Sequence, residues 1–204
     1  NLYIMTEIRQ PIKRTSIEKK QKIINAGLQV FSEKGYYNTT TAEIAQIAGV
    51  STGIVYNYFK DKKDILLQAL QVCFENTFKP ILNALNQCDF RCDFEGSIRK
   101  FVLICLQAHN TENKFAHREI MGMCMLDQDA GALLNQKENN VINAIIKALS
   151  DNGITAPNIT AKIKILYHII RDFCHTAIFE NHSENYINTV LNEILEIAKN
   201  MFFS

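Results

Sequence analysis

The sequence predicts an all-α fold of about nine helices, in which a three-helix domain containing a helix-turn-helix is followed by a larger helical domain. Apolar residues recur at intervals of three and four, and no segment shows the alternation typical of a strand. Capping residues, glycines and prolines divide the chain into pieces of helical length. The 204 residues, 47% of them apolar, suffice for a sizeable core, and we expect the two domains to cover residues 10–62 and 63–204.

The first helix is predicted from its two ends. Thr15 and Glu18 have the spacing of a capping box, in which each side chain accepts a hydrogen bond from the other residue's backbone amide. Gly35 after Lys34 is a typical helix stop, because glycine adopts the left-handed conformation at low cost. We therefore expect a helix between these signals.

Two short helices follow, and each has its own cap. Thr40 and Glu43 form a second capping-box pattern that opens one helix, which Gly49 ends. Ser51 is then placed to cap another helix from Thr52 to Phe59. Two short helices joined by a tight glycine-containing turn have the pattern of a helix-turn-helix.

The remaining helices are longer. Asp61 is placed to cap a helix running from Lys62 toward Gln87, which Pro80 is expected to kink or end. Further helices are expected at residues 93–110, 113–127, 131–152, 158–180 and 184–202. Gly153 is a predicted C-cap, and the last two helices are expected to form an antiparallel hairpin.

The charge is distributed unevenly along the chain. The net charge is only +1, but residues 1–63 hold ten Lys and Arg against five Asp and Glu, and residues 64–204 hold twelve against sixteen. This favours an N-terminal domain that meets a polyanion. Chance clustering on solvated helices is the alternative.

The chain shows no export or membrane signal. The residues before Met5, a candidate first residue, lack a long apolar stretch, and no run of 18 apolar residues occurs. We expect a cytoplasmic protein with reduced thiols and no membrane association. Its six cysteines are scattered, at Cys73, Cys88, Cys92, Cys105, Cys124 and Cys174.

The outward face of the second short helix suits the major groove of DNA. Thr52, Tyr56 and Asn57 offer hydrogen-bonding groups, Gly53 permits close approach, and Ile54 suits a thymine methyl group. The hydroxyls and amides of Thr40 and Thr41 form a candidate phosphate site. Basic residues flank this face at Lys13, Arg14, Lys19, Lys20, Lys22, Lys60, Lys62 and Lys63. The alternative is a pair of short core helices with no role in DNA binding.

Residues 15–66 resemble the N-terminal domain of the TetR (tetracycline-repressor) family of transcriptional regulators. The resemblance rests on Ala26-Gly27-Leu28, Phe31, Gly35-Tyr36, Thr41, Ile44-Ala45, Ala48-Gly49-Val50-Ser51, Gly53, Val55-Tyr56, Tyr58-Phe59, Lys62 and Leu66. It implies a homodimer that binds a pseudo-palindromic DNA operator, most commonly as a repressor. It also implies that a small-molecule effector in a C-terminal ligand-binding and dimerisation domain weakens DNA binding.

The resemblance also implies which residues meet DNA. Thr40 and Thr41 would contact phosphates, and Lys62 would hold the DNA backbone. The full set of expected DNA-binding residues is Thr40, Thr41, Ser51, Thr52, Gly53, Ile54, Tyr56, Asn57, Tyr58 and Lys62. Thr52 departs from the basic residue common at its position, which leaves the base preference open.

The last two predicted helices carry the apolar surface expected of a dimer interface. The family resemblance places a homodimer there, and a four-helix interface would bury both apolar stripes. The stripes comprise Ile163, Leu166, Tyr167, Ile170, Phe173, Cys174 and Ala177, and Ile187, Val190, Leu191, Ile194, Ile197, Ala198, Met201 and Phe202. The alternative is that both stripes serve the core of a monomer.

The expected effector pocket lies among the helices from residue 62 to 180. Its candidate lining residues are Phe74, Phe78, Phe101, Cys105, Phe115, Met121, Met125, Tyr167, Arg171 and Phe173. Most of these residues also fit an ordinary core. Arg171 either meets an acidic effector or pairs with Asp172 or Glu180. We therefore expect a mostly apolar effector, with or without an anionic group.

Other chemistries find little support. His168, Asp172 and His175 share a helical face but match no metal motif, and Cys88 and Cys92 match neither a CxxC redox pair nor a zinc set. Nucleophile-elbow, phosphate-loop, HExxH and Rossmann patterns are absent, so we expect no enzyme activity, metal or cofactor. The rival to a regulator is an architectural DNA-binding protein that needs no ligand.

Overall fold

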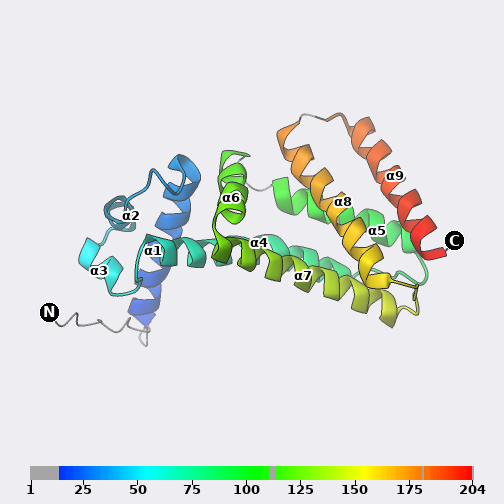
Figure 1. Ribbon diagram of the computed structural model, residues 1–204, viewed down its shortest axis with the longest axis horizontal. Coiled ribbons are helices and arrows are strands. Elements are labelled where there is room, and N and C mark those ends of the chain that lie inside the picture. Colours follow the sequence, from blue (N-terminus) through cyan, green and yellow to red (C-terminus); the bar gives the residue numbers. More distant parts are fainter. Residues whose placement is uncertain (1–13, 111–113, 181, 204) are drawn as a thin grey trace. The chain divides into compact units, whose positions relative to one another are not determined.

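A computed structural model describes residues 14–110, 114–180 and 182–203, and within these ranges all regular structure is helical (Figure 1). The described residues form nine helices and no strand, which confirms the predicted fold class. The helices are α1 (Arg14–Lys34), α2 (Thr41–Ala48), α3 (Thr52–Tyr56), α4 (Lys62–Leu85), α5 (Phe94–Asn110), α6 (Lys114–Leu126), α7 (Gln128–Asp151), α8 (Ile159–Phe179) and α9 (Glu184–Phe203).

The predicted capping box at the start of the first helix is wrong. Thr15 lies inside α1, which already includes Arg14, so Thr15 cannot serve as the residue before the helix. Glu18 instead accepts a hydrogen bond from Arg14 Nε at 3.1 Å. Met5 and the expected basic residue Lys13 lie outside the described residues.

Two other helix ends also differ from the predictions. The third helix stops at Tyr56 instead of Phe59, because the chain turns at Asn57. The backbone amide of Asn57 donates hydrogen bonds to the carbonyls of Ile54 and Val55. The seventh helix begins at Gln128 rather than near residue 131, because the Asp127 side chain accepts from the Asp129 and Ala130 amides at 3.0 and 3.1 Å.

Pro80 does not end α4, which continues to Leu85. A proline in a helix lacks one N–H donor and crowds the preceding turn. The burial of Phe78 and Ile81 on either side of Pro80 ties both neighbouring turns into the core. Tertiary packing therefore overrides the local stop signal.

The described residues divide into two compact units. The head unit comprises the described residues up to Cys73 together with Phe115–Leu133, and the body unit comprises Phe74 to Asn110, Lys114 and the described residues from Leu134 onward. The division falls within α4 and within α7. None of the helices in the described ranges has the length and apolar character needed to cross a membrane.

In the head unit α2 packs against both α1 and α3. A Cβ atom on Gly27 would lie 2.6 Å from Ile65 Cγ2, so only glycine lets α1 approach α4 this closely. Side chains that are entirely or almost entirely buried fill the core around it, among them Ile23, Val30, Ile44, Val55, Phe59 and Ile65.

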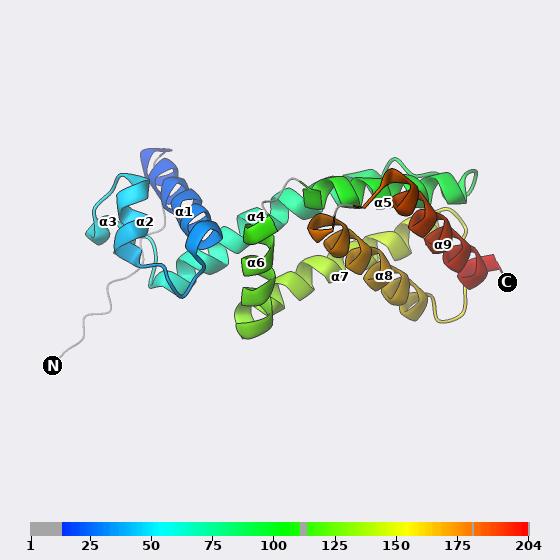
Figure 2. The same cartoon turned by 90° about the horizontal axis from the view of Figure 1, so that it is seen from above.

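In the body unit α5, α8 and α9 pack against one another (Figure 2). Their inward faces are apolar, and much of the two stripes that the sequence assigned to a dimer interface is buried within the single chain, as in the alternative of a monomer core. Val102, Ile163, Cys174, Leu191 and Ala198 are all 0 to 1% exposed. Gly153, with φ of 75°, adopts the left-handed conformation just after the end of α7, as predicted for a C-cap.

Candidate nucleic-acid interface and interior cavity

The capping box at the start of α2 is formed as predicted. The Glu43 amide donates to Thr40 Oγ1 at 3.2 Å, and the Thr40 amide donates to Glu43 Oε2 at 2.9 Å. Lys34 also pairs with Glu43 at 2.7 Å, and this hydrogen bond, followed by the bonds from Thr40, lowers the pKa of Glu43 to about 2. These contacts fix where α2 begins.

The turn between α2 and α3 also follows the predicted signals. Gly49 adopts φ of 68° and ψ of 35°, a left-handed conformation that ends α2. The Val50 amide then returns to the Ala45 carbonyl at 3.0 Å. Ser51 caps α3 by accepting from the Ile54 amide at 3.4 Å. Each helix is thus capped by residues within a few positions of its own start or end.

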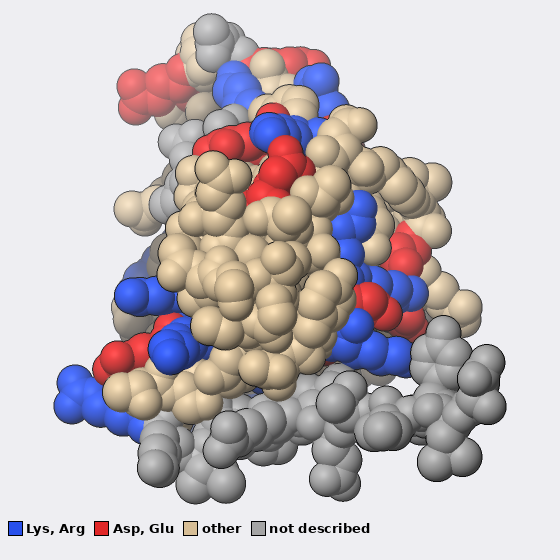
Figure 3. Space-filling model, turned by 90° about the vertical axis from the view of Figure 1, so that its left-hand side faces the viewer, with Lys and Arg blue, Asp and Glu red and all other residues tan. Residues whose placement is uncertain are grey.

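The outward face of α3 is open and uncharged. Val55 and Phe59 are fully buried and hold the segment on the head core. Thr52, Gly53 and Asn57 are exposed, Tyr56 is 52% exposed, and Ile54 is half-buried. Figure 3 shows an uncharged central area on this side of the molecule, with Lys and Arg on both sides of it among some Asp and Glu.

Two tyrosines near α3 make contacts that sequence reasoning did not foresee. The Tyr56 hydroxyl lies 3.0 Å from Thr41 Oγ1, so it joins the end of α3 to the first turn of α2. The Tyr58 hydroxyl lies 2.8 Å from Ser16 Oγ and holds the following turn to α1. Tyr58 is therefore half-buried, unlike Tyr56.

The lysines beside this face differ in what they contact. Lys62 donates to the Tyr36 and Thr39 carbonyls, both at 2.8 Å. Lys63 pairs with Asp127 at 2.8 Å and with Asp129 at 2.7 Å, and the Asp127 bond is the main reason its pKa is raised. The exposed basic side chains nearby are those of Arg14, Lys19, Lys22 and Lys60.

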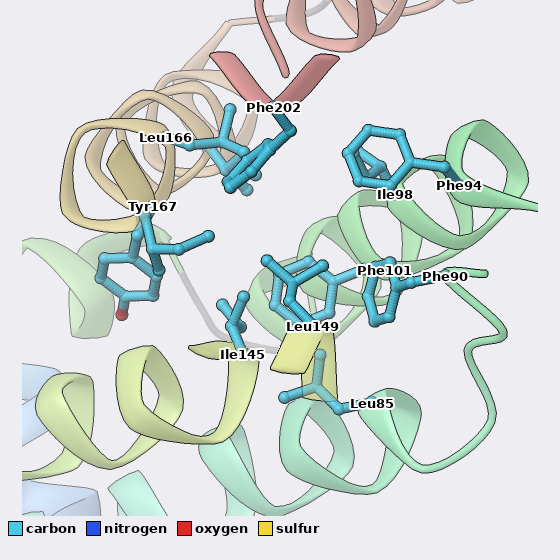
Figure 4. Close-up of a pocket in the computed structure, with 12 residues that line it drawn as sticks. Leu85, Phe90, Phe94, Ile98, Phe101, Ile145, Leu149, Leu166, Tyr167 and Phe202 are labelled. Carbon is cyan, nitrogen blue, oxygen red and sulfur yellow. The ribbon is translucent and has the colours of Figure 1, made fainter. Parts of the chain in front are cut away.

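A cavity lies inside the body unit, between α4, α5, α7, α8 and α9 (Figure 4). Its lining residues are Leu85, Phe90, Phe94, Ile98, Phe101, Ile145, Leu149, Ile163, Leu166, Tyr167, Ile170 and Phe202. All are apolar except Tyr167, whose oxygen points away from the phenyl rings in Figure 4. The space open to the centres of water-sized molecules is about 30 Å³, where one water needs about 10–15 Å³.

The predicted pocket residues only partly coincide with the residues that line this cavity. Phe101 and Tyr167 line the cavity, whereas Phe74, Phe78, Cys105 and Phe173 are buried elsewhere in the body unit. Phe115, Met121 and Met125 belong to the head unit, and Met125 is 83% exposed. Most actual lining residues were missed because Leu, Ile and Phe at helical spacing carry no signal that separates a cavity wall from ordinary core.

Arg171 has a partner that was not expected. Its Nη1 lies 2.9 Å from Glu138 Oε1 on α7, a partner other than the Asp172 or Glu180 considered from the sequence. The Glu138 side chain is only 8% exposed. Burial, followed by the charge of Glu138, raises the pKa of Tyr167, which therefore stays neutral beside this ion pair.

The other candidate sites do not assemble. In the described part of the chain no three His, Cys, Asp or Glu side chains gather as a metal site. The six cysteines, all within the described ranges, form no disulfide. Cys88 lies 3.3 Å from the Ala84 carbonyl, and burial raises the pKa of its thiol. Cys92 is exposed.

Comparison with known proteins assigns the helix-turn-helix. A family model described as bacterial regulatory proteins, tetR family, matches residues 23–69. The helix-turn-helix segment of this chain is of the TetR family. Over 54 residues it is 52% identical to the HTH-type transcriptional regulator HbdR of Aromatoleum sp. (strain CIB), covering 26% of this chain and 24% of HbdR.

A second TetR-type relative extends further. The HTH-type transcriptional regulator AcrR of Shigella flexneri is 30% identical over 102 residues, which cover 50% of this chain and 46% of AcrR. The matched stretches thus span about a quarter to a half of these curated relatives. Both relatives are transcriptional regulators by name.

Solved structures support the same fold over nearly the whole chain. A structure assigned to the TetR family from Mesorhizobium loti MAFF303099 superposes with a TM-score of 0.78 at 17% identity, covering 93% of this chain and 99% of that one. SmeT, the repressor of the Stenotrophomonas maltophilia multidrug efflux pump SmeDEF, gives 0.63 at 15% identity, covering 91% and 92%. At these identities the likeness concerns the fold alone.

The TetR family match covers the candidate interface and not the cavity. It ends at residue 69, whereas the cavity-lining residues begin at Leu85. The TetR-type head is therefore supported by both sequence and structure, and the interior of the body unit has to be interpreted from its own side chains.

Proposed function

We propose that this chain is a sequence-specific DNA-binding transcriptional regulator that places α3 in the major groove. The observation that carries the proposal is the outer face of α3, which is exposed, uncharged and able to form hydrogen bonds. The caps at the starts of α2 and α3 hold this face in place. Major-groove recognition needs short polar side chains and close approach, and this face offers both.

Each part of the face has a proposed task. Thr52, Gly53, Ile54, Tyr56 and Asn57 would meet base edges and the adjoining backbone. Thr40 and Thr41 at the start of α2, together with Ser51 and Tyr58, would meet phosphates, because hydroxyls and the N–H groups of a helix start are suited to anions. The exposed Arg14, Lys19, Lys22 and Lys60 would add attraction to the DNA backbone.

We propose that α8 and α9 form a homodimer interface. Some apolar side chains of these helices are exposed in the single chain, with Ile165 at 52%, Tyr186 at 45% and Ile197 at 36%. A second copy would cover them. Two heads related by a twofold axis would bind a pseudo-palindromic operator.

The proposed effector is a small, uncharged, apolar molecule that occupies the body cavity and releases the protein from DNA, as a repressor requires. The cavity walls are apolar, which disfavours a charged ligand. The pairing of Arg171 with Glu138 argues against the anionic effector considered from the sequence, because the cation is already neutralised. At about 30 Å³ the cavity would have to widen around most ligands.

Selection of bound fragments from random DNA tests the central proposal. We expect a short palindromic site to be enriched, and the logarithm of the affinity for it to fall with the logarithm of salt concentration by about 0.9 per phosphate contacted. Weak sequence preference would favour an architectural DNA-binding protein instead. Absence of DNA binding would exclude both the regulator and the architectural protein.

A matched ligand series tests the effector class. Hexanol, hexanoate and hexylamine share one apolar tail and differ in charge. We expect hexanol to raise the melting temperature and weaken operator binding more than either ion, because the cavity offers no polar group to a charge. Stronger action by hexanoate would instead support an anionic effector.

A further inference from the structure

The ammonium group of Lys62 is enclosed by the turn between α1 and α2. Its Nζ atom donates to the Tyr36 and Thr39 carbonyls, both at 2.8 Å, and lies 4.3 Å from the centre of the Tyr36 ring. An ammonium has three N–H donors, and two of them are used here. The contact with the aromatic ring adds a cation–π attraction.

The enclosed turn leads directly into the first turn of α2. Thr39 is 2% exposed, its hydroxyl donates to the Gly35 carbonyl at 2.8 Å, and its amide donates to the Tyr36 carbonyl at 3.3 Å. The next residue is Thr40, the N-cap of α2. The two carbonyls that Lys62 holds therefore belong to the segment that sets the direction of the first amides of α2.

We propose that Lys62 is a positioning residue for DNA binding: it fixes the turn of residues 36–39 and thereby orients Thr40 and Thr41 toward a phosphate. This rests on the proposed function, and it revises the role expected of Lys62, which was to hold the DNA backbone itself. The ammonium acts through the two carbonyls that it binds, and the Tyr36 ring lies beside it.

The neighbouring lysines provide the contrast. The Lys60 side chain is exposed and has no hydrogen bond or ion pair to another described residue. Lys63 is neutralised by Asp127 and Asp129. Lys60 is therefore the matched control, since it has the same chemistry two residues away without the carbonyl contacts.

Three variants separate positioning from direct phosphate contact: Lys62→Met, Lys62→Arg and Lys60→Met. Arginine keeps the charge and binds phosphate well. Its planar guanidinium, however, does not reproduce the compact ammonium that contacts the Tyr36 and Thr39 carbonyls and the Tyr36 ring. The full-length protein is titrated with its selected operator at several salt concentrations, well below each variant's melting temperature. Amide NMR spectra of the DNA-free proteins report on Thr40, Thr41 and Glu43.

We expect both Lys62 variants to weaken operator binding about tenfold or more, because the turn that presents Thr40 and Thr41 loses its two hydrogen bonds to the ammonium. The Lys62→Arg protein should keep the salt dependence of the parent. The amides of Thr40, Thr41 and Glu43 should shift in both Lys62 variants and stay in place in Lys60→Met, a local readout that general destabilisation does not produce.

Operator affinity that is retained in Lys62→Arg, with a salt slope about 0.9 lower in Lys62→Met, would identify Lys62 as a phosphate ligand and overturn the proposal. Unmoved α2 amides in both Lys62 variants would overturn it as well. Failure of the parent protein to select any DNA would count against the proposed function instead, since the amide shifts are measured without DNA.

Discussion

The helix-turn-helix of the head unit and the cavity of the body unit are assembled over very different distances along the chain. Thr40 and Glu43, like Ser51 and Ile54, are three residues apart. Arg171 and Glu138 are 33 residues apart, and the cavity draws its walls from five helices. The helix caps of the helix-turn-helix are set by local contacts, whereas the cavity arises only when distant helices pack.

Removing one partner of the buried ion pair should produce the largest effect and test the body side of this comparison. We expect Arg171→Met to destabilise the protein by about 3 kcal/mol, because the nearly buried Glu138 would lose its counter-charge. The value is at the low end of the usual range because the Arg171 side chain is 33% exposed. Urea unfolding measures it.

The matched control is Lys147→Met, which breaks the exposed pair between Lys147 and Asp151, four residues apart. Such a pair contributes about 0.3–0.5 kcal/mol. Equal losses in the two variants would mean that the long-range pair does not stabilise the body unit more than a local one does.

The next effect in size concerns the exposed face of the head. We expect Tyr56→Ala to weaken operator binding about a hundredfold, roughly 2.7 kcal/mol, with no change in dimerisation measured by sedimentation. Tyr56→Phe keeps the ring and loses only the hydroxyl contact with Thr41, so its loss should be smaller. Unchanged affinity in Tyr56→Ala would mean that α3 is not the recognition helix.

A smaller effect is expected at the end of α1. Gly35 has φ of 80°, and a Cβ there would lie 2.4 Å from Glu119 Oε2. We expect Gly35→Ala to cost about 1–2 kcal/mol, mainly for the left-handed backbone, because the flexible Glu119 side chain has room to give way. Gly122→Ala is the control.

Gly122 lies inside α6, and a Cβ atom added to it would meet no other atom within 4 Å. Its replacement by alanine should therefore stabilise the helix by about 0.5–1 kcal/mol. Thermal melting of both variants decides the point. Similar shifts of the same sign would show that backbone conformation does not govern the end of α1.

The smallest effect should appear in acid. The pKa of Glu43 is lowered from 4.5 to about 2, first by Lys34 and then by Thr40. Since the folded-state pKa lies below the unfolded one, the contribution of Glu43 is present above pH 4.5 and is lost as the pH falls toward 2. The melting temperatures of the parent and Glu43→Gln should therefore converge over this range, and a constant difference would contradict the assignment.

The predictions made from the sequence succeeded where the signal was local. The caps at Thr40 and Ser51 and the turn at Gly49 were predicted and are formed, because each depends on residues within four positions. The pattern at Thr15 has the same spacing but lies inside α1. A capping box is therefore formed only where the backbone leaves the helix, which the pattern itself does not specify.

The sequence by itself determined the all-helical fold, the helix-turn-helix and the exposed outer face of α3, since caps and helical periodicity act over one or two turns. Tertiary structure alone decided that Lys62 holds two backbone carbonyls, that Lys63 meets Asp127, and that Arg171 meets Glu138. It also decided which apolar residues enclose the cavity. Periodicity tells which face of a helix turns inward, but the partner across that face depends on how separate helices pack.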